Sequence, residues 1–412
     1  MRQWLSLLMG ILFLIPGATD GFPTERSGVS LSEAIALALV DAGARVVVNV
    51  PATGVTVVYD SFCDQTKTVP VYSFHEEVAY TLAHGAAVGG ARSAAILKSH
   101  GLAKAANSVI DSITAGTNAG MVALVLNDRT GKHSDNVFDS PAFLNGLKWR
   151  FTAPRPENTY SEILAAFETS EKFRIPVAVS VESDDLDRVV EIQRRVADVP
   201  VTAYHRDVYQ HLLCPLLAPY QQRLLETRLN GSPAAGEKPV LPSVPDQLPS
   251  KFRGTFLTYV PVFDVFKRIK GDDAVIAGDT GTSSLFAFSP YDCVDITTYY
   301  GGSIPLAMGF YLAGRRNVWA VTGDYAFVAA GHLGLVEAVH RGIPLKVIIF
   351  HNGVASATGG QPLPPDVFAH VIGGYGAYVR HIEDPTDREE IEKVLTTAKA
   401  SSRLEIVVVE VP

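Results

Sequence analysis

The chain has 412 residues, of which 47% are hydrophobic and only 19% charged, and its net charge at pH 7 is −8. This length and composition predict two or three domains with large buried cores and exclude a globally disordered chain. The acidic balance, without a dense run of Lys or Arg, argues against nucleic acid as a main partner. The cysteines, Cys63, Cys214 and Cys293, form no zinc or iron–sulfur pattern, so we expect free thiols in a reducing cytoplasm.

Residues 1–27 form an apolar N-terminal extension. Residues 4–16 are mostly apolar after a single Arg2, and Gly17-Ala18 could precede a cleavage site, as in a short secretory signal. An upstream start codon is the alternative explanation. The stretch is too short to predict a membrane span. We therefore expect a cytoplasmic protein without membrane association, although the signal-like segment leaves export open.

Residues 28–195 alternate between helix and buried strand. Ser30 and Ser32 can cap a helix that runs to Gly43. Apolar runs at 45–50, 93–97, 121–126 and 175–180 predict strands, with helical stretches between them. This alternation predicts a doubly wound parallel sheet with helices on both faces.

Residues 196–251 are expected to connect this domain to a second one. Residues 208–227 could be helical, interrupted by Pro215 and Pro219. Residues 229–250 contain five prolines and no periodicity, which is typical of a semi-rigid linker.

Residues 252–412 repeat the α/β pattern. Apolar strands are predicted at 274–277, 318–321, 345–350 and 404–409. The expected fold is therefore α/β, with two doubly wound parallel-sheet domains joined by a Pro-rich linker.

Two of these strands end in residues that could hold a metal ion. Asp324 follows one apolar run and Asn352 the next, and their spacing is 352 − 324 = 28. Parallel sheets bind ligands at the carboxyl ends of their strands, and Mg²⁺ prefers oxygen ligands, often with phosphate oxygens. Asp324, Asn352 and the carbonyl of Val354 could therefore bind a Mg²⁺ ion that carries a diphosphate. An ordinary helix cap is the alternative explanation for Gly323-Asp324.

The arrangement resembles the thiamine diphosphate motif, Gly-Asp-Gly followed by an Asn after the next strand. Tyr325 stands where that motif has its last Gly. The resemblance implies thiamine diphosphate and Mg²⁺ as cofactors. Backbone N–H groups at Tyr325 and Ala326, which open the next helix, could then bind the phosphates, next to Gly323.

Three further segments resemble thiamine diphosphate enzymes. Asp279-Thr280-Gly281-Thr282-Ser283 and Gly301-Gly302-Ser303-Ile304 resemble segments of pyruvate-decarboxylase-type enzymes, and Thr358-Gly359-Gly360-Gln361 resembles a loop of sulfopyruvate decarboxylase and indolepyruvate ferredoxin oxidoreductase. The resemblance implies cofactor contacts at Gly281, Thr282, Gly302, Ser303, Ile304 and Thr358. In particular, the carbonyl of Gly302 would accept the aminopyrimidine N–H, and Ile304 would bend the cofactor. Ordinary core packing is the alternative explanation for Ile304.

The first domain offers the catalytic partner. His75-Glu76-Glu77 follows a short strand and opens a helix. The resemblance implies that Glu76 contacts the pyrimidine N1′ and promotes loss of the thiazolium C2 proton, with Glu77 as the adjacent candidate. A helix-capping acid is the alternative explanation. His75 and His351 flank expected cofactor contacts and are candidates for proton transfer.

Lys98 and His100 lie in a segment that resembles a neutral segment of sulfopyruvate and phosphonopyruvate decarboxylases. A cationic Lys98 could hold a substrate carboxylate, and His100 could transfer protons. Solvated loop residues are an equally good explanation.

The resemblance covers the chain from about residue 28, with a pyrimidine-binding domain before a diphosphate-binding domain. It implies a 2-oxo-acid enzyme that works through ylide and enamine intermediates, as a homodimer or homotetramer with active sites between subunits. We favour non-oxidative decarboxylation, because protonating the enamine needs only an acid. The alternatives are an indolepyruvate-type ferredoxin oxidoreductase subunit with a redox partner, a degenerate thiamine diphosphate-binding protein, and a plain nucleotide-binding protein. The sequence does not identify the 2-oxo acid.

Overall fold

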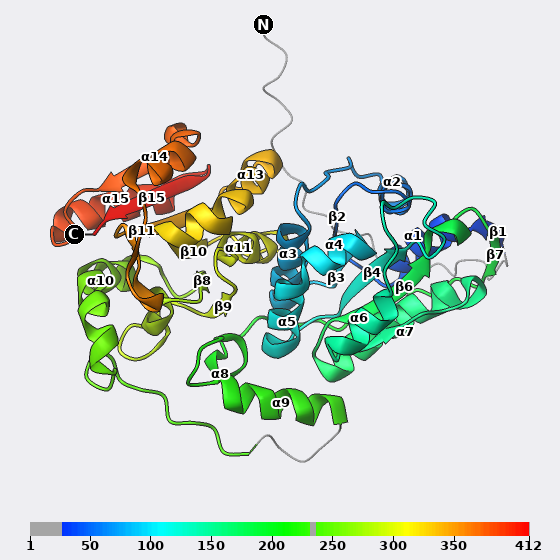
Figure 1. Cartoon of the computed structure of the whole chain (residues 1–412), viewed down its shortest axis with the longest axis horizontal. Coiled ribbons are helices and arrows are strands. Elements are labelled where there is room, and N and C mark those ends of the chain that lie inside the picture. Colours follow the sequence, from blue (N-terminus) through cyan, green and yellow to red (C-terminus); the bar gives the residue numbers. More distant parts are fainter. Residues whose placement is uncertain (1–26, 231–235, 412) are drawn as a thin grey trace, which may run out of the picture.

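The computed structural model describes residues 27–230 and 236–411, which form two α/β domains joined by a connecting segment (Figure 1). The apolar extension was predicted over residues 1–27, and its signal-like stretch lies within residues 1–26, outside the described residues. Across the described ranges, we find no helix that is both long and apolar enough to cross a membrane.

The first domain is built on a parallel sheet with the strand order β2-β3-β4-β6-β5. The strands are β2 (Val46–Asn49), β3 (Ser93–Lys98), β4 (Met121–Asn127), β5 (Phe151–Thr152) and β6 (Val177–Glu182). In the parallel registers, Val46 pairs with Ser93 and Val122 with Val177. All four strands predicted for this half are confirmed, and the short β5 is added at the edge.

Helices cover both faces of this sheet. One face packs against α1 (Leu31–Asp41), α2 (Val55–Thr66) and α7 (Thr159–Phe173), and the other against α3 (Glu76–Val88), α4 (Ser99–Lys104) and α5 (Ala106–Ala115). Successive strand residues point to opposite faces of the sheet. Val47 packs in the core on the α1, α2 and α7 side, and Val48 packs in the core on the α3, α4 and α5 side. Ser30 caps α1 by accepting the N–H of Glu33 at 3.2 Å, as predicted. The domain also contains α6 (Ser140–Gly146) and an antiparallel pair, β1 (Ser27–Ser30) with β7 (Val189–Ile192).

The second domain contains a parallel sheet with the order β14-β15-β11-β10-β8-β9. Its strands are β8 (Val275–Asp279), β9 (Ile296–Thr298), β10 (Val318–Gly323), β11 (Lys346–His351), β14 (Val379–Ile382) and β15 (Glu405–Glu410). The predicted strands correspond to β8, β10, β11 and β15. The two strands that were not predicted, β9 and β14, are short and lie at the edges of the sheet, so neither produces a long apolar run in the sequence.

One face of the second sheet is covered by α10 (Ser250–Ile269) and α15 (Arg388–Ala400), and the other by α11 (Ser303–Leu312), α13 (His332–Arg341) and α14 (Pro365–Gly373). The short α12 (Asp324–Ala326) and a π-helical turn (Phe327–Gly331) lead directly into α13. A continuous helical run therefore starts at the carboxyl end of β10. The predicted doubly wound α/β fold is confirmed in both domains.

The connecting segment contains α8 (Val208–His211) and α9 (Ala218–Asn230). Pro215 lies in the break between them, as predicted. Pro219 does not interrupt a helix, so that part of the prediction is wrong. It lies in the first turn of α9, where the missing N–H has no helical partner to lose.

The two domains share one apolar core, centred on α3 and α11 (Figure 1). The helices approach closely because glycines face the contact. A Cβ added at Gly85 would overlap the carbonyl oxygen of Leu306, and one at Gly309 would overlap the carbonyl oxygen of Leu82. The glycines in α3 and α11 therefore allow the two domains to pack closely at this contact.

Candidate active site

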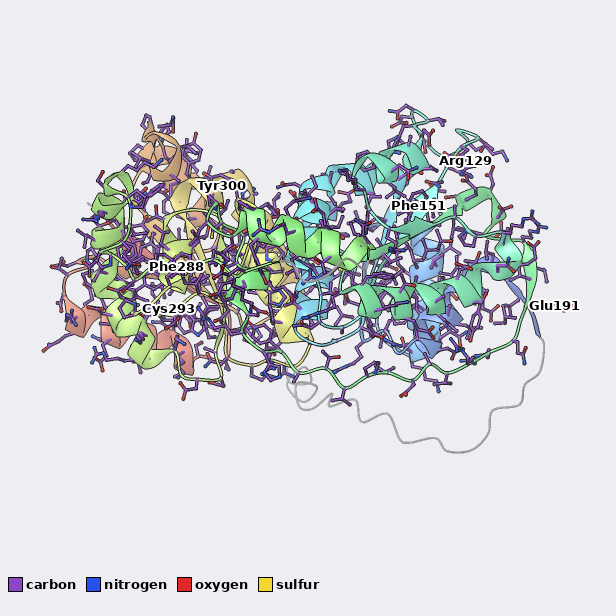
Figure 2. All side chains as sticks on the ribbon, turned by 90° about the horizontal axis from the view of Figure 1, so that it is seen from below. Arg129, Phe151, Glu191, Phe288, Cys293 and Tyr300 are labelled. Carbon is purple, nitrogen blue, oxygen red and sulfur yellow. The ribbon has the colours of Figure 1, made fainter. Side chains whose placement is uncertain are left out.

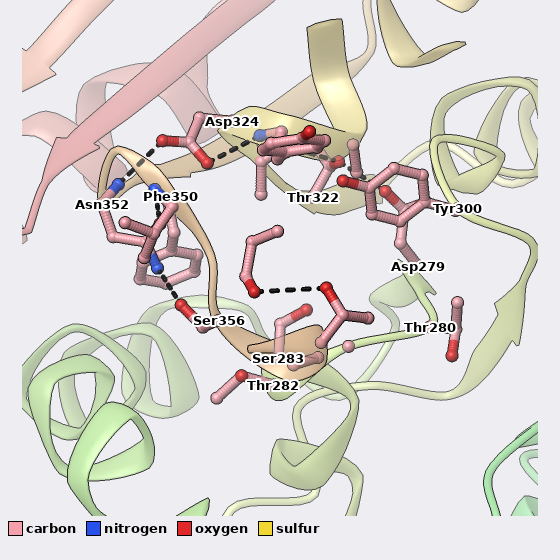
Figure 3. Close-up of a pocket in the computed structure, with 18 of the residues that line it drawn as sticks. Asp279, Thr280, Thr282, Ser283, Tyr300, Thr322, Asp324, Phe350, Asn352 and Ser356 are labelled. Carbon is pink, nitrogen blue, oxygen red and sulfur yellow. Dashed lines mark hydrogen bonds between the residues drawn. The ribbon is translucent and has the colours of Figure 1, made fainter. Parts of the chain in front are cut away.

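A cavity of about 530 Å³ lies at the carboxyl ends of β8, β10 and β11 (Figure 3). Further walls come from Tyr259 of α10 and from the loop that carries the antiparallel pair β12 (Val354–Ala355) and β13 (Gln361–Pro362). The cavity brings together the following residues predicted for the cofactor or metal: Gly281, Thr282, Gly323, Asp324, Tyr325, Ala326, Asn352, Val354 and Thr358.

Asp324 joins two strand ends at this cavity. Its side chain is buried, and three backbone N–H groups donate to it. Tyr325 donates to Oδ1 at 2.6 Å, and Asn352 and Gly353 donate to Oδ2 at 3.0 and 2.7 Å. Burial raises the pKa of Asp324, opposed by these N–H groups and by His351. Because an ionised carboxylate has about four acceptor positions, one position on Oδ1 remains for a metal ion.

Asn352 is oriented by its neighbours. Its Nδ2 donates to the hydroxyl of Tyr259 at 3.0 Å and to that of Ser356 at 2.8 Å. Its Oδ1 accepts the N–H of Val354 at 3.1 Å. An amide oxygen has two lone pairs, so Oδ1 retains one for a metal ion.

The donor set fits Mg²⁺ with a diphosphate. Asp324 Oδ1, Asn352 Oδ1 and the carbonyl of Val354 are oxygen donors, which this ion prefers. Nowhere in the described ranges do three His, Cys, Asp or Glu side chains gather to hold a metal, so water and ligand oxygens would complete the shell. The residues lining the cavity include Asp279 and Asp324 and no Lys, Arg or His. A diphosphate therefore needs a cation between itself and these carboxylates.

Glycines keep the floor of the cavity open. A Cβ at Gly281 or Gly323 would meet no other atom within 4 Å, because each faces the cavity. Gly281 also has a φ of +149°, which disfavours other residues. A bulky ligand can thus approach the backbone at both positions.

Asp279, for which the sequence reasoning gave no role, links three elements beneath the cavity. Its Oδ1 accepts the N–H of Ser303 at 2.7 Å and its Oδ2 the hydroxyl of Thr322 at 2.5 Å. Burial raises the pKa of Asp279 to about 6. Its position at a strand end in a segment already singled out was the available signal. The carboxylate fixes the start of α11 relative to β8 and β10.

Gly302, Ser303 and Ile304 are buried behind the cavity and do not line it. Ser303 reaches it indirectly, through its N–H bond to Asp279. Ile304 is fully buried and packs on Gly334, where an added Cβ would lie 2.9 Å from it. The structure thus shows core packing at Ile304, and its contact with a cofactor stays a prediction.

His75 and Glu76 lie at the first turn of α3, outside the cavity lining. Glu76 Oε2 is 2.8 Å from Lys104 Nζ. Burial, followed by the charge of Lys104, lowers the pKa of His75. The segment before α3 is attached to the second domain, because the hydroxyl of Ser73 donates to Glu337 at 2.7 Å.

His100 and Lys98 are engaged with the loop that follows β4. His100 Nε2 is 2.6 Å from Asn136 Oδ1, and its ring lies edge-on to Phe138. Lys98 Nζ donates to the carbonyl of His133. Neither residue lines the cavity.

His351 is not among the residues that line the cavity. Its Nδ1 is 2.7 Å from Glu410 Oε2, and its ring stacks on Phe368. Its Nε2 is 3.9 Å from Asp324 Oδ2, so it acts on the cavity only through that carboxylate.

Comparisons with known proteins agree with this geometry. Residues 279–411 match the family described as thiamine pyrophosphate enzyme, C-terminal TPP binding domain. The indolepyruvate oxidoreductase subunit IorA of Methanothermobacter thermautotrophicus is 27% identical over 230 residues, which cover 53% of this chain and 35% of that protein. The same subunit of Archaeoglobus fulgidus is 33% identical over 112 residues, which cover 27% of this chain and 18% of that protein. The matches thus span about a third or less of these relatives' lengths.

A solved structure shows the same fold. The thiamine diphosphate-dependent 4-hydroxybenzoylformate decarboxylase of Rhodococcus jostii superposes with a TM-score of 0.63 at 17% identity, over 93% of this chain and 99% of that one. The resemblance to thiamine diphosphate-dependent 2-oxo-acid enzymes, first drawn from the motifs, is confirmed.

Proposed function

We propose that this thiamine diphosphate-dependent enzyme also requires Mg²⁺ and decarboxylates a 2-oxo acid without passing electrons to a partner. The observation that carries the proposal is the convergence of Asp324, Asn352 and Val354 on one cavity, within the segment that matches the family. When bound, thiamine diphosphate supplies the electron sink for cleaving the bond between the 2-oxo carbon and its carboxylate.

The residues of the second domain hold and orient the cofactor. Asp324, Asn352 and the carbonyl of Val354 bind the metal ion. The cofactor itself is held by Gly281, Thr282, Gly323, Tyr325, Ala326 and Thr358 around the cavity, and by Gly302, Ser303 and Ile304 behind it. Asp279 positions the start of α11 through Ser303.

Glu76 supplies the carboxylate that exchanges a proton with the pyrimidine ring, with His75 and His100 as proton-transfer candidates. Since Glu76 does not line the cavity of its own chain, we assign it to the cavity of a second copy. The active unit is then a homodimer or a homotetramer built from it. In the free chain, Glu76 forms an ion pair with Lys104 at 2.8 Å, which cofactor binding would have to rearrange.

A second candidate is the oxidative reaction, favoured by the similarity to indolepyruvate oxidoreductase subunits. That reaction needs an electron acceptor. The cysteines of this chain lie in three separate places: Cys63 in α2, Cys214 between α8 and α9, and Cys293 before β9. The acceptor would therefore be a partner subunit.

The test supplies purified protein with thiamine diphosphate, Mg²⁺ and a panel of 2-oxo acids. We expect release of CO₂ together with the corresponding aldehyde when no electron acceptor is present. The panel contains pyruvate, phenylpyruvate, indolepyruvate, sulfopyruvate and phosphonopyruvate. Release of CO₂ only when ferredoxin or a viologen is added would replace the proposal by the oxidative candidate.

A further inference from the structure

A second cavity, of about 610 Å³, adjoins the first. It lies between α5 of the first domain, the connecting segment around α9, and the end of β9. The two cavities share Thr280 and Tyr300 as lining residues. Figure 2 shows Tyr300 on the second domain at its border with the connecting segment. The two cavities are therefore adjacent, with these two side chains at their common border.

The second cavity is lined mostly by polar residue types and carries almost no charge. Its lining residues are Asn107, Asp111, Thr114, Leu213, Cys214, Pro215, Ala218, Gln221, Gln222, Thr280, Thr298, Tyr299 and Tyr300. Asp111 is the charged residue of this set, which contains no Lys, Arg or His. Tyr299 and Tyr300 supply aromatic surface, against which a flat ring can pack.

Asp111 is held at the border between the domains and has acceptor capacity to spare. Its Oδ2 accepts the hydroxyl of Thr298 at 3.1 Å. No Lys or Arg of the described segments forms an ion pair with it. Burial raises the pKa of Asp111 to about 6, opposed by the Thr298 hydroxyl and the Tyr299 N–H. At neutral pH the carboxylate is thus mostly ionised, partly desolvated and short of hydrogen-bond donors.

The wall opposite Asp111 is fixed before any ligand arrives. Gln221 is buried, and its Nε2 donates to the carbonyls of Tyr209, Gln210 and Leu212 at 3.3, 3.2 and 3.0 Å. The N–H of Leu213 donates to the hydroxyl of Thr297 at 2.6 Å, which ties the connecting segment to β9. A pre-formed cavity with one well-placed acceptor is the usual form of a site that recognises a small molecule.

We propose that the second cavity binds the side chain of the 2-oxo acid, and that Asp111 accepts a hydrogen bond from a neutral donor on an aromatic ring, such as an indole N–H or a phenol O–H. This inference rests on the proposed function. A sulfonate or phosphonate side chain does not fit, because it would face the Asp111 carboxylate with no basic side chain in the lining. Lys98, the cation that could have suited an anionic substrate, is engaged with His133 elsewhere.

The experiment uses two 2-oxo acids that differ by one donor, 4-hydroxyphenylpyruvate and phenylpyruvate. Binding of each to the protein without cofactor is measured by calorimetry, and kcat/KM is measured with thiamine diphosphate and Mg²⁺. The variants are Asp111→Asn and Asp111→Leu, with the exposed Asp135→Asn as the matched control. Thermal unfolding checks that each variant is folded, and Thr298→Val provides a second route to disturbing the Asp111 site.

We expect the wild type and the Asp135→Asn variant to favour the hydroxylated substrate by about 10- to 100-fold in both measurements, because a buried acceptor discriminates strongly against an analogue that lacks the donor. Asp111→Leu should reduce that ratio to near one. An unchanged ratio in folded Asp111 variants, or tighter binding of phosphonopyruvate than of either aromatic acid, would overturn the inference. If the binding preference holds but no 2-oxo acid is turned over with or without an acceptor, the proposed function fails, whereas the assignment of Asp111 as the acceptor for a ring-bound donor stands.

Discussion

At the residue scale, Asp324 shows how one side chain can serve both fold and chemistry. Three N–H groups, one from α12 and two from the residues that follow β11, hold its carboxylate, and one acceptor position remains. Tyr259 and Ser356, which lie outside the sequence motif, hold the side chain of Asn352 by accepting hydrogen bonds from its Nδ2. The two proposed metal ligands are therefore held in place by neighbours that need not touch a metal ion themselves.

Replacing Glu76 separates catalysis from cofactor binding. Glu76→Gln keeps the size of the side chain and removes its negative charge, so turnover should fall by about 100-fold or more. Binding of thiamine diphosphate with Mg²⁺ should change little, because the second-domain cavity is intact. Steady-state kinetics and calorimetry give the two readings.

The neighbouring Glu77→Gln is the control, and it should retain most of the turnover. If Glu77→Gln abolishes turnover while Glu76→Gln does not, the catalytic carboxylate has been assigned to the wrong residue. If neither variant matters, the protein binds the cofactor without using it in this way.

The sequence singled out Asp324 and Asn352 because their position in a motif is visible, and the structure places both at one cavity. Sequence reasoning gave no role to Asp279, although its segment was noted, because nothing in the local pattern shows which partners a buried acid will meet. Tyr259 lies in the middle of α10, where its spacing is that of any core residue. Only the packing of α10 against β11 brings its hydroxyl to Asn352.

At the element scale, α3 and α11 define how the domains meet. The strongly apolar strands were predictable because a buried parallel sheet needs continuous apolar runs. The edge strands β9 and β14 were not, since they are only three and four residues long. Small residues such as Gly85 allow a close approach to α3, but they do not show from the sequence which helix approaches.

Gly85→Ala tests this contact. The added Cβ would overlap the backbone of Leu306, which cannot move without shifting α11, so we expect a loss of about 1–3 kcal/mol in the free energy of unfolding. Gly254→Ala is the matched control, because it lies within α10 with nothing within 4 Å of its Cβ. It should stabilise the protein by about 0.5–1 kcal/mol. Equal effects of the two variants in urea unfolding would contradict the packing described.

Two histidines are buried where the connecting segment meets α3 and α5. His84 Nε2 is 3.0 Å from the carbonyl of Gly116, and burial lowers the pKa of His84 to about 4. Burial also lowers the pKa of His211, in α8, to about 3. Both are neutral in the folded protein, whereas they gain protons on unfolding below the ordinary histidine pKa of about 6.5. Their contribution to stability is therefore complete above that pH and is lost as the pH falls toward 4.

The His84 contribution can be isolated with His84→Gln, since Asp111 and Asp279, whose pKa values are raised to about 6, act in the opposite direction between pH 4 and 6. Gln can donate to the same carbonyl but does not titrate. From pH 7.5 to pH 5, the stability of the wild type relative to the variant should fall by about 2 kcal/mol. Urea unfolding at both pH values measures this difference. A difference that does not change with pH would show that His84 is already charged or exposed in the folded state.

At the scale of the whole molecule, the proposal needs two chains for each active site. Hybrid dimers with Glu76→Gln in one chain and Asp324→Ala in the other would contain one intact site out of two. Purified through two affinity tags, they should show about half the wild-type turnover, because a closed dimer has two equivalent interfaces.

The reciprocal hybrid pairs a wild-type chain with a chain that carries both substitutions. It should be nearly inactive, because each of its two sites then contains one substituted residue. The opposite pattern, with the reciprocal hybrid active and the first one inactive, would place Glu76 and Asp324 of one chain in the same site. The predicted assembly would then be wrong, while the cavity and its ligands would stand.

We propose that the cavity at the ends of β8, β10 and β11 binds thiamine diphosphate through a metal ion held by Asp324. Calorimetric titration with the cofactor, in the presence of Mg²⁺ and in the presence of a chelator, tests it most directly. We expect binding that requires Mg²⁺, that Asp324→Ala weakens by about 100-fold or more, and that the exposed Asp272→Ala leaves unchanged. Cofactor binding that is indifferent to Mg²⁺ and to Asp324→Ala, or binding of NAD in its place, would rule out a thiamine diphosphate site bridged by a metal ion at Asp324.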